Sequence, residues 1–321
     1  MYVESEKSLY NMQLRKEELD CYYSKKTKRS IKYTLKKTVS EIVMTFIKSG
    51  LRRTIFKIRC QINKKLIFDK QTVYISNDDD LVYQYKNDYS QKKIVIYTAI
   101  FGKYDELKEP KFVNPYCDYV VFTDQPVSPN SVWKKMDISI ISGYNEMDAY
   151  HLSKIVKILP HLYFKDYEYS IWVDGTTTII GDLVAYIDRM DNHKKVIGMF
   201  DNPVHDCIYT EANFLIYYNR VPEKIIKKQI NEYKAEGYPS HNGMFECTVI
   251  VRKHNDILCR KIMENWWEQI IKYSMRDQIS FPYVLWKNKL GYNDVYILGA
   301  NRNFDLRLSF DSHLKTNIYR K

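Results

Sequence analysis

The sequence lacks several local motifs that identify common classes of protein. Its six cysteines include no Cys-x-x-Cys pair, which argues against a zinc ribbon or a thioredoxin-type redox site. Its ten glycines form no Gly-x-Gly-x-x-Gly or Walker loop, which argues against a Rossmann dinucleotide site and a P-loop. No apolar run approaches the length of a transmembrane helix, and the polar N-terminus lacks the apolar segment of a secretory signal. We therefore expect reduced thiols and a cytoplasmic protein.

One short segment carries the whole net charge of +11. Residues 28–65 contain twelve Lys or Arg and one acidic residue, so the rest of the chain sums to zero. Apolar residues recur at helical spacing from Val39 to Ile47, and a basic amphipathic helix can lie on the anionic inner face of a membrane. The alternatives are a helical hairpin with a solvated charged face and, more weakly, a nucleic-acid-binding element. We predict a basic, mainly helical region over residues 1–90.

From residue 91 to residue 321, β-prone apolar runs alternate with helical patterns. We expect strands at residues 94–101, 119–124, 136–141, 169–174, 196–200 and 247–251. We expect helices at residues 145–159, from 182 onward, and at 222–236 and 256–273, with Asn145 as one N-cap and Ser274 as the N-cap of a later helix. This alternation predicts an α/β domain with a mostly parallel sheet flanked by helices.

One of these strands ends in a carboxylate, Asp174, which Gly175 follows. In open α/β sheets, ligands bind at the carboxyl ends of the strands. An aspartate at that edge can hold a divalent cation against a diphosphate. The alternative is a strand-end aspartate that caps a turn.

The end of the first strand offers groups that suit a nucleotide. Thr98 and the rings of Phe101 and Tyr104 can contact a base, and Asp105 can reach a ribose hydroxyl. The alternative is a core strand followed by a turn.

A helix face can meet the phosphates. Lys154, Lys157 and His161 recur at i, i+3 and i+7, which predicts one shared face. The alternative is a solvated basic face.

Further polar groups lie in loops and at element ends. His205 and Glu211 can contact a sugar or a metal, although Glu211 can also simply open a helix. Glu246, beside a strand, can be the general base for an acceptor hydroxyl. Arg276 and Asp277 lie at a predicted helix N-terminus, a place that often lines pockets.

Six segments together resemble one family, the glycosyltransferase-like family of TOD/MUCI type found in plant mucilage-related and bacterial proteins. The segments occur in the family's order over residues 93–315, and we see no match in residues 1–90. They are residues 97–105, 157–161, 170–175, 206–212, 249–254 and 266–278.

The resemblance implies a GT-A-like fold and transfer of a sugar from a nucleotide donor, a UDP-sugar, to a carbohydrate or glycoconjugate acceptor in polysaccharide synthesis. Asp174 would take the place of the metal-binding Asp-x-Asp, with Mn²⁺ or Mg²⁺ as the cofactor. Thr176 stands where a second carboxylate is expected, so His313 and the diphosphate would have to complete the metal shell. If the enzyme inverts, the base would be a carboxylate such as Glu246 or Asp277; the sequence does not decide between inversion and retention.

Two rival functions remain open at the level of sequence. The Thr176 departure favours a non-catalytic protein that binds nucleotide sugars through a decayed site. The basic segment favours a nucleic-acid-associated protein, for which steeply salt-dependent binding would be the sign.

Overall fold

The structure is a computed structural model that describes residues 4–28 and 83–311, together with positions 43, 55, 58, 80 and 81. Most of the basic segment lies outside the described residues, and so does the predicted metal ligand His313. The membrane and nucleic-acid interpretations of that segment, and the division at residue 90, stay predictions. Within the described ranges, no helix combines the length and the apolar character needed to cross a bilayer.

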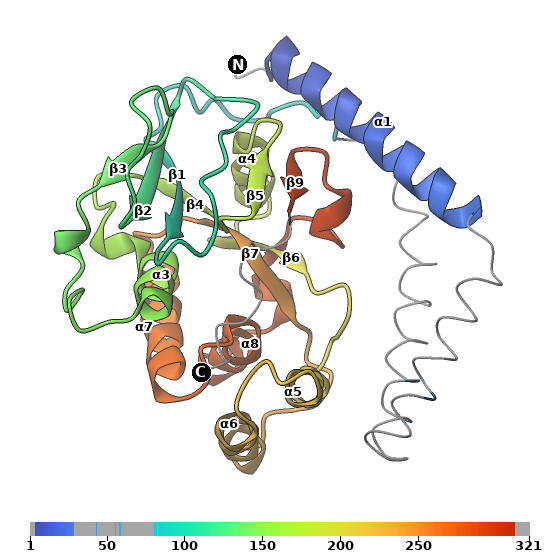
Figure 1. Cartoon of the computed structure of the whole chain (residues 1–321), viewed down its shortest axis with the longest axis vertical. Coiled ribbons are helices and arrows are strands. Elements are labelled where there is room, and N and C mark those ends of the chain that lie inside the picture. The colour runs from blue at the N-terminus through green and yellow to red at the C-terminus, as the bar shows by residue number, and fades with distance from the viewer. Residues whose placement is uncertain are drawn as a thin grey trace.

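A seven-stranded sheet forms the centre of the molecule (Figure 1). Its strands lie in the order β3 (Lys134–Met136), β2 (Cys117–Thr123), β1 (Ile94–Ile100), β4 (Tyr169–Val173), β7 (Phe245–Arg252), β6 (Ile197–Asp201) and β8 (Tyr296–Ile297). All neighbours pair in parallel except β7, which runs antiparallel to both β4 and β6. A small second sheet pairs β5 (Thr177–Ile179) with β9 (Leu308–Phe310).

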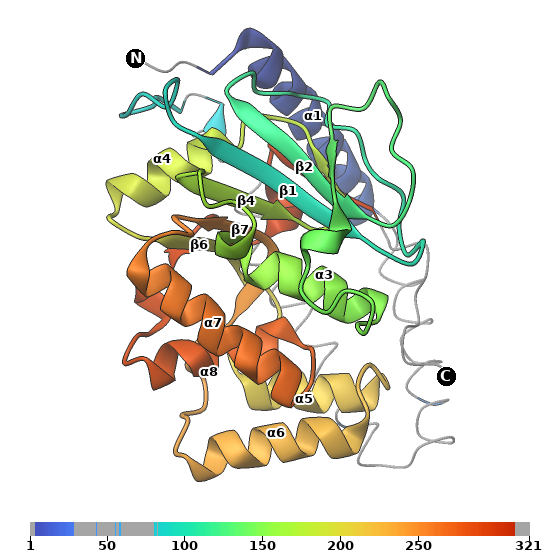
Figure 2. The same cartoon turned by 90° about the vertical axis from the view of Figure 1, so that its left-hand side faces the viewer.

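Helices cover both faces of the large sheet (Figure 2). One face carries α3 (Ala149–Ile158), α5 (Ile208–Tyr217), α6 (Glu223–Ala235), α7 (Ile257–Lys272) and α8 (Asp277–Lys287). The other side carries α4 (Val184–Asn192) and the long α1 (Glu6–Lys28). Short 3₁₀ turns complete the described elements: η3 (Ile138–Ile140), η4 (Pro160–Leu162), η5 (Tyr292–Asp294) and η6 (Arg302–Phe304). The predicted α/β class, a mostly parallel sheet flanked by helices, is confirmed.

Three predicted boundaries are wrong. Helix α3 begins at Ala149 because Asp148, not Asn145, accepts hydrogen bonds from the first free backbone N–H groups. Ser274 is not the N-cap of α8, because its hydroxyl donates to Oε1 of Gln229 and the helix begins at Asp277. The strand expected over residues 136–141 is the short β3 followed by η3.

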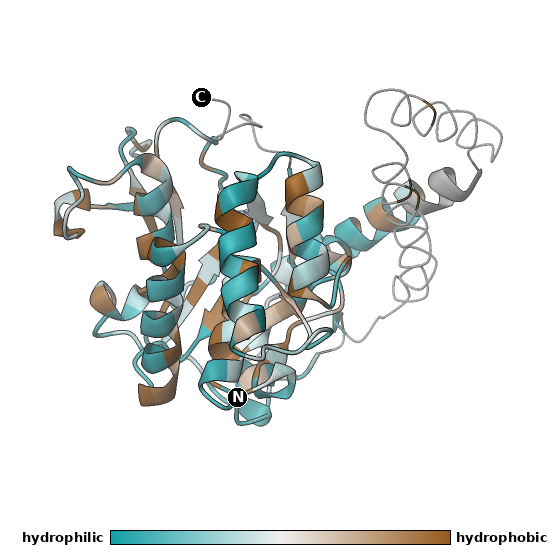
Figure 3. Cartoon of the chain, turned by 90° about the horizontal axis from the view of Figure 1, so that it is seen from below, coloured by the Kyte–Doolittle hydropathy of each residue, from teal (hydrophilic) through white to brown (hydrophobic). Residues whose placement is uncertain are grey.

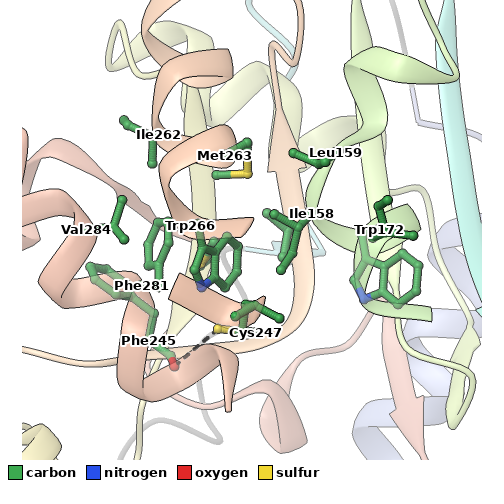
Figure 4. Close-up of a cluster of buried hydrophobic side chains, with 14 of the residues drawn as sticks. Ile158, Leu159, Trp172, Phe245, Cys247, Ile262, Met263, Trp266, Phe281 and Val284 are labelled. Carbon is green, nitrogen blue, oxygen red and sulfur yellow. Dashed lines mark hydrogen bonds between the residues drawn. The ribbon is translucent and has the colours of Figure 1, made fainter. Parts of the chain in front are cut away.

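Each face of the sheet has its own apolar core. On the α3 side, Trp266, Phe281 and Phe245 pack together, with ring centroids 4.6 and 5.3 Å apart (Figure 4). On the α4 side, Ile94 and Ile96 belong to a second cluster. The helices carry both hydrophilic and hydrophobic residues along their length (Figure 3), as expected of elements that cover a core on one side and meet water on the other.

Helix α1 packs against the α/β domain through buried contacts. Met12 is fully buried beside Gly181, where an added Cβ would lie 2.8 Å from the Met12 side chain. Ser8 Oγ accepts a hydrogen bond of 2.8 Å from the backbone N–H of Asp182. Glu4 pairs with the fully buried Arg307 at 2.8 Å. The first helix is therefore joined to the end of the described chain.

Candidate active site at the carboxyl edge of the sheet

The carboxyl edge of the parallel strands opens into a cavity of about 460 Å³. Because β7 runs antiparallel to its neighbours, its first residues reach the same edge as the last residues of β1 and β4. Helix α3 and the N-terminus of α8 form further walls. The lining includes nine of the predicted site residues: Phe101, Tyr104, Asp105, Lys154, Lys157, Asp174, Glu246, Arg276 and Asp277.

Asp174 follows β4 and faces the cavity, as its position at a strand end predicts. The backbone N–H of Asp174 donates to the carbonyl oxygen of Thr248 on β7, at 2.9 Å. Its carboxylate accepts hydrogen bonds from the indole of Trp172 at 2.7 Å and from Nζ of Lys157 at 3.1 Å. Two neighbours therefore fix its orientation.

Asp277 joins two buried lysines. Its Oδ2 accepts from Nζ of Lys154 at 2.5 Å and from Nζ of Lys157 at 2.8 Å. Burial raises the pKa of Asp277, but the two ammonium groups outweigh burial and hold that pKa well below its usual range. Burial lowers the pKa of Lys157, whereas Asp174 and Asp277 raise it, and the net shift is upward. Asp277 and Lys157 are therefore charged at neutral pH.

The end of α3 holds Lys157 in place. The backbone carbonyl of Lys157 accepts from the hydroxyl of Tyr97 at 3.0 Å and from Nη1 of the buried Arg252 at 2.8 Å. Such carbonyls at a helix C-terminus otherwise lack partners. The ammonium group of Lys157 also lies 5.5 Å from the ring centre of Trp172. The lysine is thus held at both its backbone and its side chain.

Glu246 lies near the start of β7 and is nearly buried. Its Oε2 pairs with Nε of Arg302 at 2.8 Å and accepts from the hydroxyl of Thr248, while Oε1 lies 3.4 Å from Nε2 of Gln278. Burial raises the pKa of Glu246 above the usual 4.5, and Arg302 opposes this shift in part. A carboxylate with a raised pKa is better suited to accept a proton near neutral pH.

Two arginines lie together at another part of the cavity wall. Nη2 of Arg276 donates to the backbone carbonyl of Arg220 at 3.1 Å. The Nε of Arg276 is buried and makes no hydrogen bond within the described part of the chain. Both guanidinium groups lower the pKa of Tyr104, which burial raises more strongly.

Four predicted site residues lie outside the cavity lining. Thr98 alternates with Tyr97 and Ala99 along β1, so its side chain points to the α4 side of the sheet. His161 does not share the face of Lys154 and Lys157, because α3 ends at Ile158 and His161 lies in η4, 3.4 Å from Glu264.

His205 and Glu211 contact each other. Nδ1 of His205 lies 2.7 Å from Oε2 of Glu211 on α5, and its ring packs near Phe214. This contact joins the loop after β6 to α5, and neither residue lines the cavity. The fifth residue not found there, His313, lies outside the described residues.

The described residues around Asp174 do not fit a divalent cation. The ammonium group of Lys157 already contacts the carboxylate on which the cation was predicted to sit. Among residues 4–28, 83–311 and the isolated positions, no group of three His, Cys, Asp or Glu side chains is arranged to hold a metal. Thr176, at the expected second position, is buried and supplies no carboxylate.

Sequence reasoning missed several residues of the cavity wall. Arg302 follows β8 in a 3₁₀ turn, and Arg220 lies in the loop after α5. Neither arginine follows a periodic pattern or a predicted strand end, so no local signal marks them. Gln278 and Thr248 were also missed, although Gln278 follows the predicted Asp277 on α8 and Thr248 lies two residues after the predicted Glu246 on β7.

Comparison with solved structures finds likenesses of low TM-score and low identity. One is titled as the apo structure of the bifunctional glycosyltransferase WbbM, with a TM-score of 0.40 and 12% identity over 66% of this chain and 40% of that one. Another is mouse xyloside xylosyltransferase 1, with a TM-score of 0.36 and 9% identity over 64% of this chain and 84% of that one.

Sequence comparison reaches a named family. The chain is 23% identical over 223 residues to "Probable hexosyltransferase MUCI70" of Arabidopsis thaliana, which covers 60% of this chain and 37% of that protein. The chain thus spans little more than a third of that relative's length.

The family described as "TOD1/MUCI70, glycosyltransferase-like domain" matches residues 2–298. The expectation that residues 1–90 lie outside the resemblance is therefore wrong, while the predicted class of activity, glycosyl transfer, agrees with both names. This chain belongs to the TOD1/MUCI70 family of glycosyltransferase-like domains.

Proposed function

We propose that the cavity binds a nucleoside-diphosphate sugar and transfers its glycosyl group to an acceptor hydroxyl. The observation that carries this proposal is the buried pair Lys154 and Lys157, held by Asp277 in a cavity at the carboxyl edge of the sheet. Ammonium groups placed there can stabilise the negative charge that develops on a departing diphosphate. Family membership supports the same class of reaction.

The reaction makes and breaks one bond at the anomeric carbon. The acceptor oxygen attacks that carbon, the bond from the carbon to the phosphate oxygen breaks, and the nucleoside diphosphate leaves with the electron pair. The acceptor hydroxyl gives its proton to a base. Lys154 and Lys157 face the leaving group and offer positive charge that does not have to reorganise during the step.

Of the two carboxylates predicted as the base, Glu246 suits the role better. The pKa of Asp277 is held well below its usual range by two ammonium groups, which makes it a weak base. The pKa of Glu246 is raised by burial, and its carboxylate lines the cavity. Asp277 is then a positioning residue for the lysines.

The donor, the acceptor and the location are further parts of the proposal. We propose that the transferred sugar is a hexose, because the curated relative is named "Probable hexosyltransferase MUCI70". We also propose a UDP-sugar as the donor and a carbohydrate or glycoconjugate as the acceptor, in polysaccharide synthesis, as the family resemblance implies. We also propose a cytoplasmic protein that associates with the inner face of a membrane, because residues 28–65 carry +11. The donor set described above does not support the predicted Mn²⁺ or Mg²⁺.

A donor panel tests the proposed reaction. The protein is incubated with nucleotide sugars, and release of nucleoside diphosphate is measured for the wild type and for Glu246→Gln. We expect one donor to be cleaved and the variant to be slower by about 100-fold or more. Glu223→Gln, on the exposed surface of α6, is the matched control and should leave the rate unchanged.

One result would contradict this function, and another would contradict the role of Glu246. Tight donor binding without release would favour the non-catalytic binding protein. Release that is equally fast in Glu246→Gln would remove Glu246 from the reaction.

A further inference from the structure

We propose that side-chain cations, with Lys157 at the position where a metal ion was predicted, hold the donor's diphosphate without a divalent cation. This inference rests on the proposed function and deepens it, because it states how the same cavity recognises the phosphates. It also assigns Asp174 a different role, in which the carboxylate positions Lys157 and does not bind a metal ion.

The ammonium group of Lys157 lies at the carboxylate where a metal ion was predicted. Nζ of Lys157 lies 3.1 Å from Asp174 and 2.8 Å from Asp277, so one ammonium group already bridges the two carboxylates. Its side chain is only 4% exposed. Lys157 and Trp172 both contact Oδ1 of Asp174, so a metal ion would have to bind through Oδ2, beside an ammonium group whose like charge repels it. The backbone contacts at the end of α3 hold the lysine in place.

Lys154 and Lys157 have N–H donors beyond those that bind the carboxylates. Each ammonium group has three N–H donors. Lys157 uses two of them on Asp174 and Asp277, and Lys154 uses one on Asp277. Within the described part of the chain, three of the six donors remain for a ligand, and both side chains line the cavity. A phosphate oxygen accepts such bonds strongly because both partners are charged.

The side chains that line the cavity carry a net positive charge. The cavity is lined by five cations, Lys154, Lys157, Arg220, Arg276 and Arg302, and by four carboxylates, Asp105, Asp174, Glu246 and Asp277. Five minus four leaves a net charge of +1 for these side chains without any metal ion. The diphosphate of a nucleotide sugar carries two negative charges, so the lining compensates half of its charge by itself.

The net positive charge of the cavity lining can be assigned to particular side chains. Lys154 and Lys157 balance Asp174 and Asp277, and Arg302 balances Glu246. Arg220, Arg276 and Asp105 remain, two cations and one carboxylate, and the buried Nε of Arg276 makes no hydrogen bond among the described residues. Arg276 immediately precedes Asp277 at the start of α8, next to the lysines that Asp277 holds. The diphosphate is therefore expected between Arg276 and the two lysines.

Calorimetry with nucleoside diphosphates tests this inference. UDP, GDP, ADP and dTDP are titrated into the wild-type protein in EDTA and, separately, in Mn²⁺. We expect one of them to bind in EDTA with an affinity within about threefold of that in Mn²⁺. Direct titration of Mn²⁺, followed by electron paramagnetic resonance, should show no site on the protein.

Substitutions separate the two roles of Asp174. Asp174→Asn keeps a carbonyl oxygen for Lys157 and Trp172 but removes a negative charge near the diphosphate. If Asp174 positions a lysine, this variant should bind the nucleotide in EDTA at least as tightly as the wild type. If Asp174 ligates a metal, this variant should lose the binding that the wild type shows in Mn²⁺.

Lys154→Met tests the cations directly. Asp277 keeps Lys157 as a partner in this variant, so folding should survive. We expect nucleotide affinity to fall about tenfold or more, the effect of losing one charged hydrogen bond. The matched control is Lys134→Met, whose side chain is 74% exposed, and it should bind like the wild type.

The outcomes distinguish this inference from the proposed function. Binding that requires Mn²⁺ and disappears in Asp174→Asn would overturn the inference and leave glycosyl transfer standing. No binding of any nucleotide under either condition would overturn both. Binding in EDTA that Lys154→Met leaves unchanged would also overturn the inference, because the diphosphate would then lie elsewhere.

Discussion

At the scale of single residues, the ion pairs of Asp277 dominate the candidate site. Its carboxylate is shared by two ammonium groups at 2.5 and 2.8 Å, and the side chain is only 12% exposed. Removing one partner from a buried ionic group is costly, because it leaves uncompensated charge behind. The site is therefore expected to contribute to stability as well as to binding.

Asp277→Asn should lower the free energy of unfolding by about 3 kcal/mol, measured by urea denaturation at neutral pH. The folded pKa of Asp277 lies below its usual value of 3.8, so its stabilisation is present above that pH and is lost as the pH falls through the folded pKa. The difference between the wild type and the variant should therefore shrink only below about pH 4.

The matched control for this substitution is Asp166→Asn, at an exposed position. An equal loss of stability in both variants would contradict the ion-pair account.

Glu246 gives a prediction about pH. A base must be unprotonated, so the rate of donor cleavage should fall as the pH drops through the pKa of Glu246. Because burial raises that pKa, the acid limb of kcat/KM should lie above pH 4.5. An acid limb of kcat/KM at lower pH would show that a group other than Glu246 must lose its proton for the reaction. The same acid limb in Glu246→Gln would show this as well.

The sequence was sufficient to predict those site residues whose position follows from a strand end or from helix spacing. Asp174 follows a buried strand, and Lys154 and Lys157 lie one turn apart on a helix. Thr98 and His161 were placed wrongly, because strand parity and the end of α3 at Ile158 put them elsewhere.

At the scale of elements, irregular chain accounts for the two arginines that were missed, Arg220 and Arg302. Arg302 reaches Glu246 only because the chain after β8 returns to the cavity, a long-range arrangement that no local pattern encodes. The displaced N-cap of α8 has a similar cause, since Ser274 donates to Gln229 on a different helix. Tertiary contacts outweighed local capping preferences there.

Helix α1 leads to a prediction about the N-terminal region. Met12→Ala should lower the free energy of unfolding by about 2–5 kcal/mol, because the fully buried side chain packs on the α/β domain. Leu14→Ala, at a 42% exposed position on the same helix, is the matched control and should change little. A single thermal unfolding transition, with a midpoint temperature below that of the wild type, would show that α1 and the domain unfold together.

If α1 behaved as an independent unit, Met12→Ala would leave the main transition unchanged. That result would contradict the docking described for Glu4, Ser8 and Met12.

At the scale of the whole molecule, the parallel class of the sheet was predictable and its one reversed strand was not. Alternating apolar runs and helical patterns indicate a mostly parallel sheet, but they do not show direction. The antiparallel run of β7 brings Glu246 to the edge where β1 and β4 end. One strand direction thus decides whether the two carboxylates, Asp174 and Glu246, can share a cavity.

The uneven charge of the chain also belongs to this scale. Exchanging Arg52, Arg53 and Lys57 for glutamine should weaken flotation with vesicles that contain anionic lipid, by about 1 kcal/mol for each charge near the surface. Neutral vesicles serve as the control. Unchanged flotation of the triple variant would remove the membrane proposal.

The central claim is that the cavity beside Lys154 and Lys157 binds a nucleotide sugar. The most direct measurement is isothermal calorimetry of the wild type and of Lys154→Met against a panel of nucleotide sugars. We predict that one donor binds the wild type and binds the variant about tenfold or more weakly. The claim would be contradicted if no donor bound the wild type, or if the donor bound both proteins equally well.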